Sequence, residues 1–352
     1  MPALADVLSA LTDYANKPAT AHDLRAEPGD TFGGPPFTTL MQFVQGLGAR
    51  ADLDAVITAV AATIRTSDPF RSGTIALACG TLVEWGGDPG TVFPHLLSEL
   101  PRHLALARRA HEHEEMAPGA LFDADPDAAR AAKGLTYLLL ATMTVICRKA
   151  EFRQALRADP EIISGIEAIH STHREANFVA RVLDLVDDTE LLVLAPNEQK
   201  GFFVKLEAIA SCAHLFTLLQ AALIDGGHLA GAPTDPEVLA VARGEQPPEQ
   251  LLTDHARFHF TPWYSLTSAE PSAESALDGL MVMGVEAHPS GIPRFEDVPV
   301  VLVGPTVFAA RSWDSNFFAN IHDALRSRVE IIEVLSEAEA AKWLGRIRSA
   351  PR

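Results

Sequence analysis

The residues best suited to chemistry in this sequence are histidines, of which there are 13. Glu167 and His170 are three residues apart, so on a helix they share a face and can offer a carboxylate and an imidazole to one ion. Di-iron carboxylate bundles use this Glu-x-x-His spacing, but they need it twice, together with two further glutamates. The helical half has no second copy, and His173 falls on an apolar face. The sequence therefore predicts no bound metal, with Glu167 and His170 as the candidates to test.

A second group of polar residues lies in an aromatic-rich stretch that resembles a β-strand. The alternation of a strand places His255, Arg257 and His259 on one face and two phenylalanines on the other. Such a polar face is able to line a cleft, although a half-buried structural strand shows the same pattern. No serine occurs in a Gly-x-Ser-x-Gly elbow, and no cysteine has a visible base beside it, so no reaction follows from these residues.

The loop after the apolar run Val298–Val303 is a candidate anion site. In open parallel sheets, ligands bind beyond the carboxyl ends of the strands, where helix N-termini present free N–H groups. Thr306, Arg311 and Ser312 stand there, just before a predicted helix. The loop has neither a Gly-x-Gly-x-x-Gly fingerprint nor a P-loop lysine. In the alternative interpretation, Arg311 pairs with an acidic neighbour and Ser312 only caps its helix.

The elements that carry this loop form a β-α-β-α unit at the end of the chain. The pattern predicts strands over Val298–Val303 and Val329–Leu335 and helices over Ser312–Ser327 and Ser336–Arg348, the last opened by a Ser-x-x-Glu capping box. Strands joined by a helix-length connection are expected to run parallel in one sheet.

The preceding chain is helical by periodicity as far as about residue 187, where the composition changes. Apolar positions recur at a spacing of about 40 residues, which suits either HEAT-like hairpins or an irregular helical bundle. A helix is predicted from Pro160 to Val186, and a β-hairpin from Glu190–Leu194 and Phe202–Ile209. The fold class is therefore α+β with two domains, an all-α domain 1–187 and a mixed α/β domain 188–352.

Composition limits the classes of function. The net charge of −18 argues against nucleic acid and against an anionic membrane surface as partners. No apolar stretch is long enough for a membrane span, and the N-terminus has no secretory signal pattern. The three cysteines are far apart and lie among apolar residues, as expected for reduced thiols in the cytoplasm.

The function that these patterns favour is a cytosolic binding or scaffold protein without a cofactor, acting on a protein partner or a small anionic ligand. The alternative is an enzyme with its site at the junction of the helical and α/β domains, binding an anionic small molecule near residues 304–312. A small-molecule sensor or regulatory subunit is the third possibility.

Overall fold

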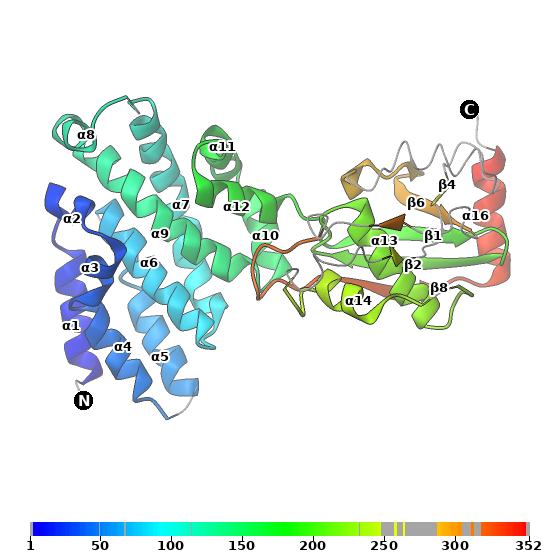
Figure 1. The fold of residues 1–352 in the computed structure, drawn as a ribbon, viewed down its shortest axis with the longest axis horizontal. Helices are drawn as coiled ribbons and strands as arrows, with labels where there is room; N and C mark the ends of the chain where they lie inside the picture. Colours follow the sequence, from blue (N-terminus) through cyan, green and yellow to red (C-terminus); the bar gives the residue numbers. More distant parts are fainter. Residues whose placement is uncertain are drawn as a thin grey trace. The chain divides into compact units, whose positions relative to one another are not determined.

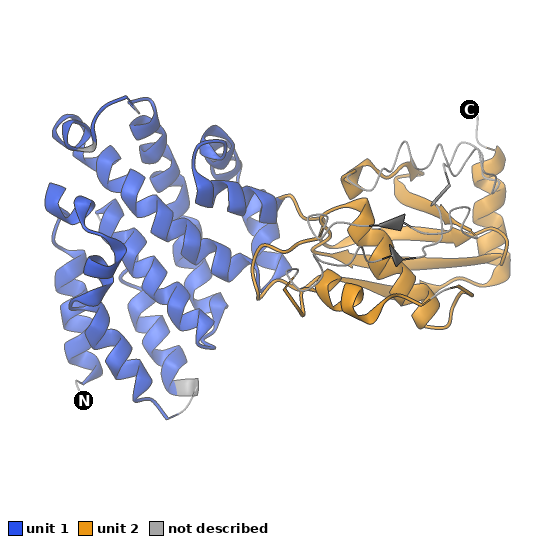
Figure 2. Ribbon diagram, in the orientation of Figure 1, with its two compact units in different colours: residues 1–183 blue, residues 184–352 orange. Residues whose placement is uncertain are grey.

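The computed structural model describes residues 3–48, 50–66, 68–113, 115–231, 233–247, 287–304 and 318–349, together with the backbone of strand residues 257–258, 263–264 and 311–312. The chain divides into two compact units, residues 1–183 and 184–352 (Figure 2). A helical N-terminal region followed by a mixed sheet confirms the α+β class (Figure 1).

Unit 1 is helical throughout its described length. Helix α6 is buried at every residue from Pro69 to Ala76, including the polar residues Arg71, Ser72 and Thr74. Helix α9 packs against both α6 and α7 (Figure 1). In chain order the helices of unit 1 are α1 Leu4–Ala15, α2 Ala21–Arg25, α3 Pro28–Gly33, α4 Phe37–Gln45, α5 Arg50–Ala61, α6 Pro69–Glu84, α7 Pro89–His111, α8 Pro118–Ala124, α9 Pro126–Ile146, α10 Ala150–Arg157, α11 Pro160–Ile169 and α12 Arg174–Leu183.

The same dipeptide, Asp-Pro, opens several helices in both units. The aspartate accepts hydrogen bonds from backbone N–H groups of the first turn, and the proline occupies a position where its missing N–H is not needed. Asp125, for example, accepts a hydrogen bond from the N–H of Ala128 at the start of α9. The pattern is repeated at Asp68-Pro69, Asp88-Pro89, Asp159-Pro160 and Asp235-Pro236.

Helices α6 and α9 approach each other closely enough that their backbones touch. A Cβ atom added to Gly73 would lie 2.1 Å from the carbonyl oxygen of Gly134, and one added to Gly134 would lie 2.4 Å from the carbonyl oxygen of Pro69. Both distances are far inside van der Waals contact with rigid main chain. Glycine is therefore required at both positions for this helix pair to form.

Replacing Gly134 with Ala is expected to lower the stability of unit 1 by at least about 2 kcal/mol, because the new methyl group forces the two backbones apart. Gly29→Ala is the matched control, since no atom lies within 4 Å of a Cβ at that helical position. The control should leave stability unchanged or raise it slightly through helix propensity. Urea unfolding followed by circular dichroism measures both, and equal stability of the two variants would contradict the described contact.

Unit 2 is a mixed sheet with the strand order β4-β6-β1-β2-β8. Strand β1 pairs antiparallel with β2 and parallel with β6, while β2 pairs antiparallel with β8 and β4 antiparallel with β6. Strand β5 also pairs with β6, and β3 pairs with β7 in a separate ribbon. The strands are β1 Thr189–Ala195, β2 Lys200–Glu207, β3 Arg257–Phe258, β4 Trp263–Tyr264, β5 Arg294–Phe295, β6 Val298–Val303, β7 Arg311–Ser312 and β8 Arg328–Val334.

Both faces of this sheet are covered. Leu191 and Val193 of β1 belong to a core shared with α13 (Cys212–Gln220), its π-helical extension η1 (Ala221–Asp225) and α14 (Pro236–Ala242). Leu192 and Leu194 face the opposite way, into a core shared with α16 (Glu337–Ser349). Alternate residues thus enter different cores, which explains why the central strands are continuous apolar runs.

The expected helix over Ser312–Ser327 is wrong in its described part. Arg311 and Ser312 are extended in β7, and residues 318–327 form turns. Side chains there bond the backbone instead of leaving it to a helical ladder: the ring Nδ1 of His322 accepts from the Ala324 N–H, and the Ser327 hydroxyl donates to the Ala208 carbonyl. Strands β6 and β8 do run in the same direction, but β1 and β2 lie between them.

The expected single helix from Pro160 to Val186 is also interrupted. It is divided into α11, which ends at Ile169, and α12, which begins at Arg174. The N–H groups of Thr172 and His173 and the hydroxyl of Thr172 all donate to the Ile169 carbonyl, which closes the last turn of α11. This break places His173 in a turn between two helices instead of on a helix face.

His214 is a fully buried histidine in unit 2 whose ring ties α13 to α14. Its Nδ1 accepts from the N–H of Ala210 at 3.2 Å, and its Nε2 donates to the carbonyl of Ala242 at 2.7 Å. A neutral ring satisfies both bonds. Burial lowers the pKa of His214 to about 4, because the charged form would lose its hydration.

Because the pKa of His214 is lower in the folded than in the unfolded chain, its contribution to stability is complete above about pH 6.5 and is lost as the pH falls toward about 4. We expect a loss of roughly 3 kcal/mol over that range. His214→Gln keeps a donor and an acceptor but does not titrate, so its stability should fall less steeply with pH. His22→Gln, at an exposed site, is the control. Urea titrations at several pH values measure the slopes, and parallel slopes in H214Q and the unmutated protein would contradict this assignment.

Within the described part of the chain, no helix is both long and apolar enough to cross a membrane.

Candidate functional site

The residues proposed for the α/β unit are only partly within the described structure. His255, His259 and Thr306 lie outside the described residues. Arg257 and Ser312 are directly opposite each other in the β3–β7 pair, and Arg311 is opposite Phe258. The backbone thus brings the two predicted groups together. The helix that was expected to add its N-terminus to the anion site does not begin at Ser312, because this residue is in β7.

The candidate metal ligands Glu167 and His170 are at the end of α11. The ring Nδ1 of His170 bonds the backbone carbonyl of Glu167 at 2.9 Å, not the carboxylate. His173 instead contacts Glu175, with Nδ1 3.5 Å from its carboxylate. Among the described residues, no group of three or more His, Cys, Asp or Glu side chains is placed to hold a metal ion.

We expect purified protein to carry no stoichiometric zinc or iron, because His170 uses one ring nitrogen on a carbonyl and no second Glu-x-x-His accompanies it. Elemental analysis of the protein purified without chelator checks this. A content of about one metal per chain that disappears in the His170→Ala variant would overturn the prediction.

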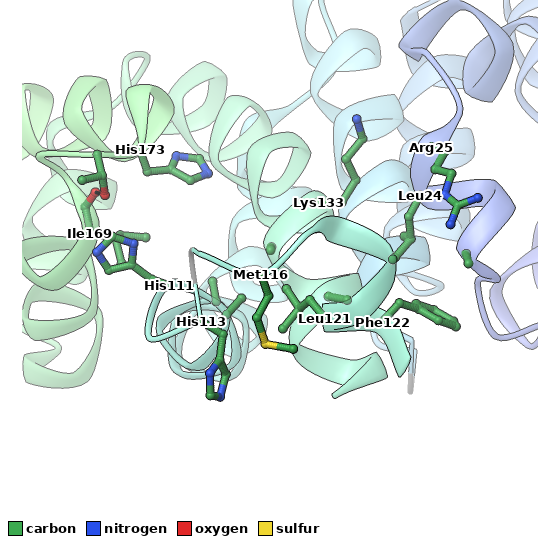
Figure 3. Close-up of a pocket in the computed structure, with 17 residues that line it drawn as sticks. Leu24, Arg25, His111, His113, Met116, Leu121, Phe122, Lys133, Ile169 and His173 are labelled. Carbon is green, nitrogen blue, oxygen red and sulfur yellow. Dashed lines mark hydrogen bonds between the residues drawn. The ribbon is translucent and has the colours of Figure 1, made fainter. Parts of the chain in front are cut away.

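The described side chains do form a cavity that the sequence did not reveal. It lies within unit 1 and has a volume of about 550 Å³, within the range of roughly 300–1,000 Å³ typical of small-molecule sites (Figure 3). Its lining is mainly apolar. The residues that line it are Ala21, Leu24, Arg25, Ala107, Ala110, His111, His113, Met116, Gly119, Leu121, Phe122, Ala129, Ala132, Lys133, Ile169, Thr172 and His173.

Small residues on two long helices make room for this cavity. Ala107 and Ala110 are one turn apart on α7, and Ala129 and Ala132 are one turn apart on α9. Larger apolar side chains, including those of Met116 and Phe122, come from α8 and the segment before it. The site is therefore an alanine-lined space closed by a short helix and its connections.

His111 and His113 both line the cavity because α7 ends at His111. His111 is the last residue of α7 and His113 lies in the turn that follows. On a continuous helix, residues two apart point to different sides. The helix stops between them, so the spacing rule does not apply, and both line the cavity (Figure 3).

His173 contributes a polar ring to the same cavity. Its Nδ1 accepts from the N–H of Ala176 at 3.3 Å, and its Nε2 is 3.5 Å from the hydroxyl of Thr136. Burial lowers the pKa of His173, although the nearby Glu175 carboxylate acts in the opposite direction. The ring is therefore mainly neutral near pH 7 and presents hydrogen-bonding capacity more than charge.

A second polar cluster, on α7, is structural. The ring of fully buried His103 lies 2.9 Å from the carbonyl of Glu99 and 3.0 Å from that of Pro69. These contacts hold the middle of α7 against the start of α6. Both ring nitrogens are engaged with backbone, so neither is available to a ligand.

Unit 2 has a more polar cavity of about 490 Å³ between residues 244–247 and 319–326. Its lining carries charges of both signs, Glu245 and Asp323 with Arg326. The guanidinium of Arg326 donates to the carbonyls of Asp323 and Leu325, so it is held by its own turn. This arrangement selects no class of ligand.

Comparison with protein-family models, with curated proteins and with solved structures found no match to this chain.

Proposed function

We propose that this protein is a binding protein and that its helical unit takes up an apolar molecule in the cavity between α7, α8 and α9. The observation that carries the proposal is the cavity itself, about 550 Å³ and lined mainly by alanine, leucine, isoleucine, methionine and phenylalanine side chains. Well-packed proteins rarely keep a space of this size without a use for it, because each unfilled volume forfeits packing energy.

The site also supports binding in preference to catalysis. Nucleophilic catalysis needs a serine, cysteine or threonine beside a base, and the lining offers one hydroxyl, that of exposed Thr172. The three cysteines are buried elsewhere, and burial raises the pKa of each thiol to about 12, which leaves almost no nucleophilic thiolate. Hydrophobic contact is the interaction that this lining provides in quantity.

The test uses N-phenyl-1-naphthylamine, an uncharged probe whose fluorescence increases in apolar surroundings. We expect saturable binding of about one probe per chain, because the described residues of unit 1 form this apolar cavity of suitable size. Ala132→Phe places a large side chain inside the cavity and should abolish the signal. Ala168→Phe adds the same side chain at an exposed position of α11 and should leave it unchanged.

A thermal melt verifies that both variants are folded. Met116→Ser is a second variant that does not overpack the cavity, because it exchanges an apolar lining side chain for a smaller polar one. It should lower the affinity for the probe severalfold. Absence of saturable binding by the unmutated protein would overturn the proposal. So would unchanged binding by both A132F and M116S.

The alternative function, an enzyme that binds an anionic small molecule near residues 304–312, is favoured by one observation: β3 and β7 put Arg257 opposite Ser312. If it holds, phosphate or a carboxylate should raise the melting temperature, and Arg311→Ala should remove that effect.

A cytoplasmic location, a protein partner, HEAT-like hairpins and independently folding domains at 1–187 and 188–352 also stay predictions. Limited proteolysis tests the domain boundary.

A further inference from the structure

The charged residues that line the unit 1 cavity, Arg25 and Lys133, have the same sign. No aspartate or glutamate lines it. The chain as a whole has a net charge of −18, with 46 acidic residues against 28 lysines and arginines. A lining with cations but without a carboxylate therefore departs from the rest of the protein, and it favours a ligand with negative charge.

Other arginines around this cavity are held by carboxylates. Arg71 pairs with Asp23 at 3.0 Å, Arg109 pairs with Asp125, and Arg130 pairs with Asp127 at 3.1 Å. Arg130 also lies 3.3 Å from the buried carboxylate of Asp68. The carboxylates of Asp23, Asp68, Asp125 and Asp127 are thus engaged with arginines that do not line the cavity.

Lys133 and Arg25 differ from these arginines. Neither side chain forms a hydrogen bond or an ion pair with any residue that the structure describes. They come from separate elements, α9 and α2, and Leu24 lies beside Arg25 in the lining (Figure 3). The guanidinium of Arg25 lies against α8, with Nη2 3.1 Å from the position of a Cβ on Gly119. Two cations that have no side-chain partner among the described residues therefore border an apolar space.

We propose that the ligand of this cavity is an amphipathic anion, an apolar chain with a carboxylate or phosphate head group. The chain lies among the apolar side chains, and the head group pairs with Lys133 and Arg25. This inference rests on the proposed function, because it requires that the cavity binds an apolar molecule at all. Charge-assisted hydrogen bonds to lysine and arginine are the interactions that distinguish such a ligand from a neutral one of equal length.

The experiment compares decanoate with decanol, which share the alkyl chain and differ in the charge of the head group. Each displaces N-phenyl-1-naphthylamine from the protein at neutral pH and low salt. We expect decanoate to bind at least tenfold more tightly than decanol, which corresponds to about 1.4 kcal/mol. Added sodium chloride should reduce this preference, since the head group interacts through charge near the surface.

Two variants assign the preference to named side chains. Lys133→Met keeps the apolar stem and removes the charge, and Arg25→Gln keeps a polar amide. Each should reduce the affinity for decanoate severalfold and leave the affinity for decanol unchanged. Lys17→Met removes the same charge from an exposed residue that does not line the cavity, and it should preserve the preference.

The outcomes separate the two proposals. If the neutral probe and decanol do not bind, the proposed function fails and the present inference fails with it. If both bind, but decanoate shows no advantage or keeps it in K133M and R25Q, the cavity is an apolar site and the anionic ligand is wrong. Decyl phosphate, measured in the same way, identifies the head group: tighter binding than decanoate assigns a phosphate, and weaker binding a carboxylate.

Discussion

The helical unit depends on the backbone contact between α6 and α9 at Gly73 and Gly134. A side chain at either position would overlap main-chain atoms of the partner helix, so the helix pair exists only because both residues lack a Cβ. The contact also fixes the axis of α9 beside the buried α6. Lys133 and Ala132, which precede Gly134 directly, are thereby directed to the cavity. The geometry of the candidate site is thus a consequence of a contact outside it.

Asp68 extends this constraint to a second wall of the cavity. Its side chain caps α6 by accepting from the Arg71 N–H, accepts from the N–H of Ala19 just before α2, and pairs with Arg130 of α9. A single buried carboxylate therefore ties α2 and α9 to the start of α6. Because three separate elements satisfy it, the cost of removing its charge from water is offset by hydrogen bonds.

The pairing of carboxylates with other groups explains why the cavity lining is cationic in an acidic protein. The carboxylates of Asp23, Asp125 and Asp127 pair with arginines that do not line the cavity, so they serve the structure. Arg25 and Lys133 are left without such partners among the described residues. An apolar space bordered by these two cations has complementary chemistry to a molecule with one apolar and one negative end.

The sequence by itself determined the local elements: Asp-Pro starts, apolar periodicity and Gly-rich breaks place most helices of unit 1, and continuous apolar runs place β1 and β6. It did not determine how these elements meet, because short-range patterns carry no information about partners distant in the chain. The alanine pairs on α7 and α9 are compatible with close helix packing and with a cavity. Only the position of α8 in the folded unit decides which of the two forms. In the same way, periodicity alone continued two predicted helices, but the structure divides one of them between Ile169 and Arg174 and has turns at residues 318–327 in place of the other. The tertiary structure therefore decided the site: it brought α2 to α8 and α9 around one apolar space, although helices α3 to α7 lie between α2 and α8 in the sequence.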